Sequence, residues 1–400
     1  MKIGFVGTCF WPIIGGMETY LYRLSREFVI QGHAVTVATR FVNKRPREMM
    51  EKFTKIEQSK KYNQEGVKVH VISAGSVGKQ LLKPVYRLHF YKITEIFAIT
   101  LFSLAFYKSI EVILEDCDIL HYSGTGRELL GYCALKLAKK KKIPFVITPH
   151  THIGSWGEGD IDLRLYRQAD IVIVLTKVER DYFIKNDIPE SKLRIIENGV
   201  NVTGNGKSDE FQSKYKIKNT IILFVGRKDG SKGYPLLLEA AKLVWRKIPN
   251  VNFVFIGPRE DVHSFDKEFQ EILKDSRVHE LGIISEKEKE DAYAACDIFC
   301  LPSAAEAFGM VYLEAWKYKK PVIALNIPTL NELIGTINGG LLVKKDPGDV
   351  ARAIITLLED KDLRENLGRN GFKRLKGNSW GNIAKKIEFI YKNISKQSRE

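Results

Sequence analysis

The alternation of strand-like and helix-like segments constrains the fold of this chain more than any other feature of its sequence. The first forty residues predict a strand from Lys2 to Thr8, a loop containing Gly15 and Gly16, an amphipathic helix from Glu18 to Ile30 and a strand from Ala34 to Thr39. Further strands are predicted at residues 67–73, 119–122, 145–148, 171–175 and 194–196. Strands that alternate with helices at this spacing indicate a parallel sheet covered on both faces.

The same alternation begins again after a polar, glycine-rich stretch from Asn201 to Lys218. Strands are predicted here at residues 220–226, 251–257, 298–301, 322–324 and 341–343. Four hundred residues also exceed what one hydrophobic core usually serves. We therefore predict an α/β protein with two doubly wound, Rossmann-like domains at residues 1–200 and 201–378, followed by a closing helical segment at 379–400. Two such domains that face each other would hold a ligand in a central cleft, beyond the carboxyl ends of their strands.

The charge of the chain favours anionic partners. Its 63 basic and 48 acidic residues give a formal net charge of +15, and a positive field attracts phosphorylated substrates, anionic membranes and nucleic acid alike. The basic residues are dispersed and no zinc-finger, KH or RNP signature is present, which disfavours nucleic acid. The start of the chain predicts a strand instead of a signal peptide, so a cytoplasmic location is expected. Five cysteines without a CxxC pair argue against a disulfide framework or a zinc site.

Two segments of the first domain raise the question of membrane contact. Residues 79–108 are rich in aromatic side chains with interspersed cations, and they suit either a membrane interface or a helix that covers the sheet, which the architecture favours. The longest apolar stretch, from Ile96 to Tyr107, is too short to span a bilayer. A basic segment, Lys44-Arg-Pro-Arg47 with Lys52, Lys55, Lys60 and Lys61, suits either anionic lipid head groups or a solvated, mobile loop.

Two glutamates flank a predicted helix start in the second domain. Glu306 follows a strand, whereas Glu314 lies eight residues later inside a helix. Between them, the backbone N–H groups of Phe308, Gly309, Met310 and Val311 have no helical acceptor and suit a phosphate at the positive end of the helix dipole. Carboxylates on either side of an anion site fit a sugar-nucleotide pocket, and the alternative is a pair of solvated surface carboxylates.

Cations and glycines follow other predicted strands. Arg227 ends one strand and Lys232 precedes a helix, where both can neutralise a diphosphate, while Lys228 is interpreted as an ordinary surface cation. Their stretch does not fit the P-loop pattern, and Gly15-Gly16 lacks the GxGxxG spacing of a dinucleotide site. These departures disfavour a P-loop NTPase and a hydride-transferring enzyme.

Histidines follow the strand at residues 145–148. His150 lies at the carboxyl end of this strand, where it can donate to a sugar hydroxyl or to a developing charge. A metal site with His152, Asp160 and Asp162 is the alternative, but their spacing matches no ligand pattern. The DxD pattern Asp116-Cys-Asp118 precedes its strand, at the end away from the expected cleft, and is interpreted as a turn.

Together these segments resemble glycosyltransferase family 4, the retaining, metal-independent transferases of the GT-B fold. The resemblance rests on Gly15-Gly16-Met-Glu18, Thr148-Pro-His150, Gly226-Arg227 with Lys232-Gly233, and the stretch from Glu306 to Glu314, with support from Gly32-His-Ala-Val35, Glu197-Asn-Gly-Val200 and Pro321-Val-Ile-Ala324. The chain departs from the family pattern at one place. Shortly before Pro321, at position 318 or 319, the family often has glycine, whereas this chain has Tyr318 and Lys319.

The resemblance implies a role for each of these residues. Arg227 and Lys232 would hold the donor diphosphate with the amides near Gly16 and at Phe308, Gly309, Met310 and Val311. Glu314 would bind the nucleotide ribose, Glu306 the donor sugar, and His150 the sugar or departing phosphate, with Glu306 and His150 as the catalytic pair. The helix from Trp380 would brace the first, acceptor-binding domain. No metal or other cofactor is implied.

The expected activity is the transfer of a hexose-type sugar, with retention, from a nucleotide-diphosphate donor such as a UDP- or GDP-sugar. The acceptor would be a sugar, lipid-linked or phosphorylated, in glycan or glycolipid biosynthesis, and the enzyme would work in the cytoplasm with peripheral contact to the anionic inner face of the membrane. Two alternatives stay open, a non-catalytic sugar-nucleotide-binding subunit and an epimerase or phosphorylase of the same fold.

Overall fold

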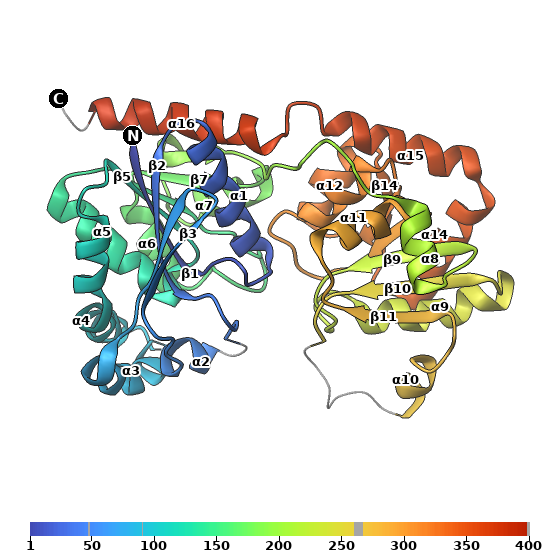
Figure 1. Cartoon of the computed structure of the whole chain (residues 1–400), viewed down its shortest axis with the longest axis horizontal. Helices are drawn as coiled ribbons and strands as arrows, with labels where there is room; N and C mark the ends of the chain where they lie inside the picture. Colours follow the sequence, from blue (N-terminus) through green and yellow to red (C-terminus); the bar gives the residue numbers. More distant parts are fainter. Residues whose placement is uncertain (47–48, 90, 260–266, 398–400) are drawn as a thin grey trace. The chain divides into compact units, whose positions relative to one another are not determined.

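The computed structural model divides the chain into two compact units (Figure 1). Unit 1 comprises Met1–Asn198 together with Trp380–Glu400, and unit 2 comprises Gly199–Ser379. The structure describes residues 1–46, 49–89, 91–259 and 267–397. Each unit is a parallel sheet with helices packed on it, so the predicted α/β class is confirmed.

Unit 1 is built on an eight-stranded sheet with the order β3-β4-β2-β1-β5-β6-β7-β8. All neighbouring strands pair in parallel except β3 and β4. The strands are β1 (Lys2–Cys9), β2 (Ala34–Phe41), β3 (Lys60–Gln64), β4 (Val67–Val71), β5 (Ile119–Ser123), β6 (Phe145–Thr148), β7 (Ile171–Val174) and β8 (Leu193–Ile195). Strands β1 and β5 are neighbours, with Val6 opposite Tyr122, so the chain order reverses direction between them.

The helices of unit 1 carry apolar faces that cover this sheet. They are α1 (Gly16–Ile30), α2 (Met49–Thr54), α3 (Gly75–Leu88), α4 (Glu95–Leu114), α5 (Leu130–Lys141), α6 (Asp160–Gln168), α7 (Lys177–Lys185) and α16 (Trp380–Gln397), with short 3₁₀ turns at Gly126–Glu128 and Glu190–Lys192. One buried cluster joins Leu120 and Ile147 of the sheet to Phe102 of α4 and Leu137 of α5. Burial on this scale is the main force that holds the helices in place.

Two predictions for unit 1 were wrong in detail. Residues Lys60–Gln64, expected in a basic loop, form the antiparallel edge strand β3, because Tyr62 and its neighbours pair with β4. The apolar stretch from Ile96 to Tyr107, interpreted as too short to span a bilayer, belongs to the longer, 20-residue helix α4. Among the described helices, α4 alone is long and apolar enough to cross a membrane, a test that core helices of soluble proteins also pass.

Unit 2 contains a six-stranded, wholly parallel sheet with the order β11-β10-β9-β12-β13-β14. Its strands are β9 (Thr220–Val225), β10 (Val251–Ile256), β11 (Val278–Gly282), β12 (Ile298–Leu301), β13 (Val322–Leu325) and β14 (Gly340–Val343). Its helices are α8 (Ser208–Tyr215), α9 (Tyr234–Lys247), α10 (Lys267–Ile272), α11 (Glu286–Ala295), α12 (Met310–Lys317), α13 (Pro328–Ile334), α14 (Pro347–Glu359) and α15 (Lys361–Arg374), with a 3₁₀ turn at Gly335–Ile337. The strand order reverses between β9 and β12, which is where ligands bind in such sheets.

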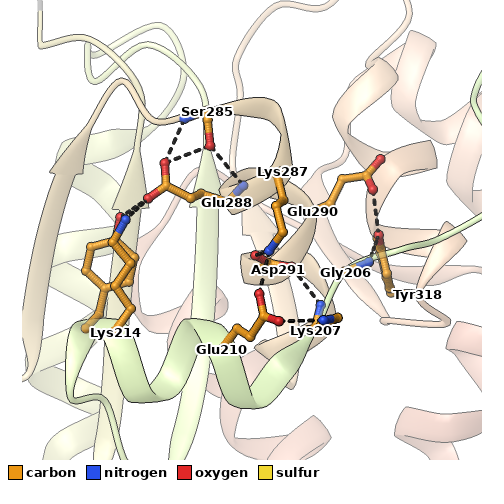
Figure 2. Close-up of polar contacts among 11 residues, drawn as sticks. Gly206, Lys207, Glu210, Lys214, Ser285, Lys287, Glu288, Glu290, Asp291 and Tyr318 are labelled. Atoms are coloured by element: carbon orange, nitrogen blue, oxygen red, sulfur yellow. Dashed lines mark hydrogen bonds and ion pairs between the residues drawn. The ribbon is translucent and has the colours of Figure 1, made fainter.

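The stretch expected as a polar linker contains helix α8, and α11 holds it (Figure 2). The backbone N–H of Lys207 donates to Asp291 at 2.7 Å, and the Lys287 ammonium pairs with Asp291 and with Glu210 of α8. A capping box between Ser285 and Glu288 starts α11 at this point. Polar contacts across elements therefore fix a segment whose composition alone indicates a loop.

Helix α16 follows unit 2 in sequence but packs on unit 1. The ring of Tyr391 stacks on Phe28 of α1 at 5.5 Å, and its hydroxyl lies 2.5 Å from Nδ1 of the buried His121 on β5. Nε2 of the same histidine lies 2.8 Å from the hydroxyl of Thr148. A buried polar network thus joins the last helix to the middle of the first sheet.

Candidate active site

The loop between β9 and α9 is organised by a buried aspartate that the sequence analysis did not single out. Oδ1 of Asp229 accepts hydrogen bonds from the backbone N–H of Lys232 at 3.0 Å and from the hydroxyl of Ser231 at 2.6 Å. Its other oxygen lies 3.5 Å from Nε of Arg227. Asp229 therefore positions both residues predicted to bind the diphosphate, Arg227 and Lys232, just beyond the end of β9. The sequence signal that could have identified Asp229 is an acidic residue between two glycines, Gly226 and Gly230.

This loop is in close contact with the loop that follows β12. Gly233 has a positive φ of 75°, and a Cβ atom there would lie 2.1 Å from the carbonyl oxygen of Pro302. The backbone N–H of Ala304 donates to the carbonyl of Ser231 at 2.8 Å. Only glycine permits this approach, so Gly233 is a requirement of the site geometry.

The contact between the loops brings Lys232 and Glu306 together. Nζ of Lys232 lies 2.7 Å from Oε1 of Glu306, and the glutamate is 9% exposed. The cation comes from the segment after β9 and the carboxylate from the segment after β12, which are the two strands at which the order of the sheet reverses. Two groups predicted separately from the sequence thus form one ion pair at the carboxyl edge of unit 2.

Helix α12 begins beside this pair, as predicted from the spacing of Glu306 and Glu314. It starts at Met310 after Gly309, whose φ is 96°, and no side chain caps it. The first backbone N–H that bonds back is that of Tyr312, to the carbonyl of Gly309 at 3.1 Å. The amides of Met310 and Val311 therefore head the helix, whereas the side chain of Phe308 is buried.

Glu314 has different partners from those of Glu306. Its carboxylate accepts a hydrogen bond from the hydroxyl of Tyr293 at 2.9 Å and pairs with Lys289 at 3.1 Å. Both partners lie on α11. The side chain is about a quarter exposed, at 26%, so it remains accessible to a ligand group.

Lys228 is not the surface cation that the sequence predicted. Its side chain is almost fully buried, at 2% exposure, and its Nζ pairs with Glu280 at 2.8 Å. The other oxygen of Glu280 accepts a hydrogen bond from the hydroxyl of Tyr234. A buried lysine needs such a partner because an unpaired charge there is very costly. Glu280 lies too far along the sequence for this pairing to be predicted.

His150 lies in unit 1, directly after β6, and it is buried in an unusual backbone conformation. Its φ is 56°, its exposure is 3%, and its Nε2 lies 3.0 Å from the hydroxyl of Ser123. Burial, and secondarily the nearby His152, lower the pKa of His150 to about 3. The imidazole is therefore neutral near pH 7 and can act as a hydrogen-bond donor or acceptor, not as a fixed cation.

The turn that holds His150 is fixed by Glu179, a residue that the sequence analysis missed. Its two carboxylate oxygens accept hydrogen bonds from the backbone N–H groups of Thr151 at 3.0 Å and Leu175 at 2.8 Å. Burial raises the pKa of Glu179 to about 7, although these hydrogen bonds act in the opposite direction. Nothing in the local sequence marks a helical glutamate for this role.

Gly16 is the first residue of α1, and Gly15 in the loop before it lies against the side chains of Glu18 and Arg45. A Cβ atom at Gly15 would lie 2.3 Å from Oε2 of Glu18, which is buried and pairs with Arg45 at 3.3 Å. A second buried carboxylate, Glu128, pairs with Lys52. Two cations of the segment predicted to contact lipid or solvent therefore face the interior of unit 1, and Arg47 of that segment lies outside the described residues.

The acidic residues considered as metal ligands beside His150 have other partners. Asp160 pairs with Lys92 at 2.9 Å, and Asp162 accepts hydrogen bonds from the backbone N–H groups of Arg127 and Gly159. Within the described ranges, no group of three or more His, Cys, Asp or Glu side chains is arranged to hold a metal ion. These aspartates stabilise the start of α6.

Comparison with known proteins assigns the family. The sequence model of the family described as Glycosyltransferase Family 4 matches residues 56–203, and that of Glycosyl transferases group 1 matches residues 207–374. The two matches together span most of both units. The chain belongs to glycosyltransferase family 4. The family resemblance read from the sequence is confirmed, and this transferase carries Arg227, Lys232, Glu306 and Glu314 in the part matched by the second model.

Three similar proteins place the transferase among its relatives. An uncharacterised 41.2 kDa protein of the cps region of Klebsiella pneumoniae is 30% identical to this chain over 240 residues. The match covers 57% of this chain and 65% of the Klebsiella protein, which is just under two thirds of that protein's length. A D-inositol 3-phosphate glycosyltransferase of Corynebacterium glutamicum is 25% identical over 94% of this chain and 91% of its own. The solved structure of Anabaena HepE in complex with UDP and glucose superposes with a TM-score of 0.74, at 18% identity, over 98% of this chain and 100% of that chain. At that identity the likeness shows the fold, which is GT-B.

Proposed function

We propose that this transferase moves a hexose-type sugar from a nucleotide-diphosphate donor, with retention at the anomeric carbon. The observation that carries the proposal is the 2.7 Å contact between Lys232 and Glu306 at the reversal of strand order in unit 2. An ammonium group has three donors, so Lys232 can hold Glu306 and still donate to a phosphate oxygen. The complex of HepE with UDP and glucose supports a nucleotide-sugar ligand for this fold.

The proposed reaction separates charge along the bond between sugar and diphosphate. Negative charge on the departing diphosphate is stabilised by Arg227, Lys232 and the amides of Met310 and Val311. These fixed donors supply the counter-charge, so we propose no metal or other cofactor. The positive charge at the anomeric carbon is stabilised by Glu306. Because the ion pair with Lys232 makes this carboxylate a weaker nucleophile but leaves it ionised, we favour a stabilising role over a nucleophilic one. The bond from the anomeric carbon to the diphosphate breaks, and the acceptor hydroxyl attacks from the face that the diphosphate leaves and gives its proton to a departing phosphate oxygen.

The remaining groups position the substrates. Glu314 binds the ribose hydroxyls, and His150, neutral near pH 7, hydrogen-bonds to the sugar or to the departing phosphate. The acceptor is lipid-linked or phosphorylated, and the D-inositol 3-phosphate named for the Corynebacterium relative supports a phosphorylated acceptor. We place the enzyme in the cytoplasm, with peripheral contact to the inner face of the membrane.

Conservative substitutions of the ion pair test this function. Glu306→Gln keeps a hydrogen-bond acceptor for Lys232 but removes the negative charge, and it should lower kcat on the order of 100-fold or more. The assay measures release of nucleotide diphosphate from UDP-glucose, GDP-mannose and ADP-glucose, with water or added acceptor. Lys232→Met should lose a similar factor. Glu314→Gln is the matched comparison, because it should raise KM for the donor and leave kcat close to that of the unsubstituted enzyme.

The possible outcomes separate the competing functions. Near-normal turnover in both Glu306→Gln and Lys232→Met would overturn the proposed roles. Tight donor binding without nucleotide release from the unsubstituted protein would indicate a non-catalytic subunit instead. Release of nucleotide with a free, epimerised sugar as the product would indicate an epimerase. Circular dichroism and the melting temperature of each variant show whether unit 2 is still folded.

A further inference from the structure

The outward face of α4 is unusually apolar. Six of the thirteen large hydrophobic side chains that are exposed in the described chain lie between residues 91 and 112. Ile96, Phe97, Leu104 and Val112 lie on α4, with Leu104 66% exposed, and Tyr91 and Ile93 lie in the turn just before it, with Ile93 95% exposed. A helix on the surface of a soluble domain normally places polar residues at such positions. A concentrated set of exposed apolar side chains therefore indicates a surface that binds something.

The opposite face of α4 belongs to the core of unit 1. Ala98, Phe102, Phe106, Ile110 and Leu114 are fully or almost fully buried there. Crossing a bilayer would expose all of these side chains to lipid and remove them from the core that they share with the sheet. The helix is therefore suited to lie on a membrane, not to cross it.

The helix packed against α4 carries exposed positive charge. Helix α3 packs along α4, and Figure 1 shows the two helices side by side. Lys79, Lys83 and Arg87 are spaced at i, i+4 and i+8 on α3, so they lie on one side of it, and all three are exposed. The helix contains no acidic residue. Exposed cations on one helix and exposed apolar side chains on the helix packed against it suit the boundary between anionic head groups and acyl chains.

We propose that the outer faces of α3 and α4, here called the α3–α4 face, bind a membrane that contains anionic lipids. The apolar side chains of α4 enter the head-group boundary, and the cations of α3 contact lipid phosphates. An apolar protein partner would not require the three cations, which is why the charge complementarity favours a lipid surface. The inference rests on the proposed function only in that a lipid-linked acceptor would be met at this surface.

The test is flotation of the full chain with two kinds of vesicle. Vesicles of phosphatidylcholine with about 30% phosphatidylglycerol should carry the protein upward, and pure phosphatidylcholine should not, since the leaflet charge attracts each cation. Raising the salt from about 0.1 M to about 0.5 M should release most of it, because the Debye length shortens. Lys79→Gln, Lys83→Gln and Arg87→Gln together should lower partitioning on the order of 100-fold. Phe97→Ser with Leu104→Ser should also abolish flotation.

Matched controls exclude general effects of charge and hydrophobicity. Lys177→Gln, Lys185→Gln and Lys385→Gln remove the same charge from exposed positions elsewhere in unit 1. Phe389→Ser removes an apolar side chain that is 66% exposed, as Leu104 is. Both controls should float as the unsubstituted chain does. The proposal is overturned if the unsubstituted chain does not float, if the α3–α4 variants float equally well, or if the face captures a protein but no vesicle.

The result is independent of the sugar-transfer assignment. Stabilisation by UDP-glucose, GDP-mannose or ADP-glucose is measured on the same variants, and it should be unchanged because none of the proposed donor residues lies on α3 or α4. A protein that floats but neither binds nor cleaves a nucleotide sugar would overturn the proposed function and leave the membrane surface in place. A protein that cleaves the donor but does not float would do the reverse.

Discussion

At the residue scale, three buried carboxylates of this transferase pair with cations from distant parts of the sequence. Glu306 pairs with Lys232, Glu128 with Lys52 and Glu18 with Arg45. Removing one member of such a pair leaves an uncompensated charge, and the expected cost is about 3–5 kcal/mol. Loss of activity in an alanine variant therefore needs a folding control. Glu179 differs, because its oxygens accept backbone N–H groups.

The titration of Glu179 predicts how the stability of unit 1 depends on pH. Its pKa rises from 4.5 to about 7 on folding, so between these values the folded state holds a proton that the unfolded state has lost. This contribution to stability decreases as the pH rises through that window. His121 and His150 act in the opposite direction, because burial lowers the pKa of each from 6.5 to about 3, and their contribution is lost as the pH falls below 6.5.

Glu179→Gln should remove one of these opposing effects. Between pH 8 and pH 5 the variant should lose about 2 kcal/mol more stability than the unsubstituted chain, because the gain that Glu179 provides on acidification is absent. Urea unfolding of the full chain at several pH values, followed by hydrogen exchange in unit 1, measures this difference. Identical pH dependence in the two proteins would show that the pKa of Glu179 is not raised.

At the scale of elements, two helices connect parts of the fold that are distant in sequence. Helix α11 holds α8 through Asp291 and Lys287, as Figure 2 shows, and it holds Glu314 through Tyr293 and Lys289. The orientation of Glu314, the side chain proposed to bind the ribose, therefore depends on α11. The sequence analysis did not connect that helix with Glu314. Helix α16 in turn depends on the contact of Tyr391 with His121 and Phe28.

Tyr391→Phe should loosen α16 without removing its ring contact. The substitution keeps the stack on Phe28 but leaves Nδ1 of the buried His121 without its hydroxyl partner, which costs about 1–3 kcal/mol. Faster hydrogen exchange in α16 and a lower melting temperature of unit 1 are expected. Tyr62→Phe is the control, since that hydroxyl donates to the carbonyl of Trp11 at a partly exposed position, and it should have a smaller effect. Equal effects of the two would contradict the role of the buried network.

At the scale of the whole molecule, four of the five side chains proposed to bind the donor belong to unit 2. Arg227, Lys232, Glu306 and Glu314 lie between Gly199 and Ser379, whereas His150 and Gly16 belong to unit 1. A ligand that binds only the folded state stabilises it in proportion to the logarithm of its concentration over Kd. Donor binding should therefore act on the two units unequally.

Hydrogen exchange of the full chain tests this asymmetry. With a matching donor at about one hundred times its Kd, amides of unit 2 that exchange only through unfolding should slow about 100-fold. The first amides of α12 should be protected as well, while β3 and β4 should change little. A screen of UDP-, GDP- and ADP-sugars by melting temperature identifies the donor first. Protection confined to unit 1 would contradict the placement of the donor residues.

The sequence by itself determined the periodic features of this protein. Strand and helix periods indicated the two sheets, and the strand ends predicted at Gly226 and Leu301 placed Arg227, Lys232 and Glu306 at one edge, because parallel strands end on the same side. The structure ends these strands at Val225 and Leu301. The spacing of Glu306 and Glu314 also predicted where α12 begins. These inferences succeeded because hydrophobic period and glycine position are local properties of the chain.

Only the tertiary structure decided which charges are buried and what each one touches. It paired Lys228 with Glu280, Lys52 with Glu128, and His121 with Tyr391, whose positions along the chain are far apart. It also turned a basic segment into the edge strand β3 and left one face of α4 apolar and exposed. The physical reason is that burial and pairing depend on which elements pack together, and local sequence carries little information about a partner dozens or hundreds of residues away.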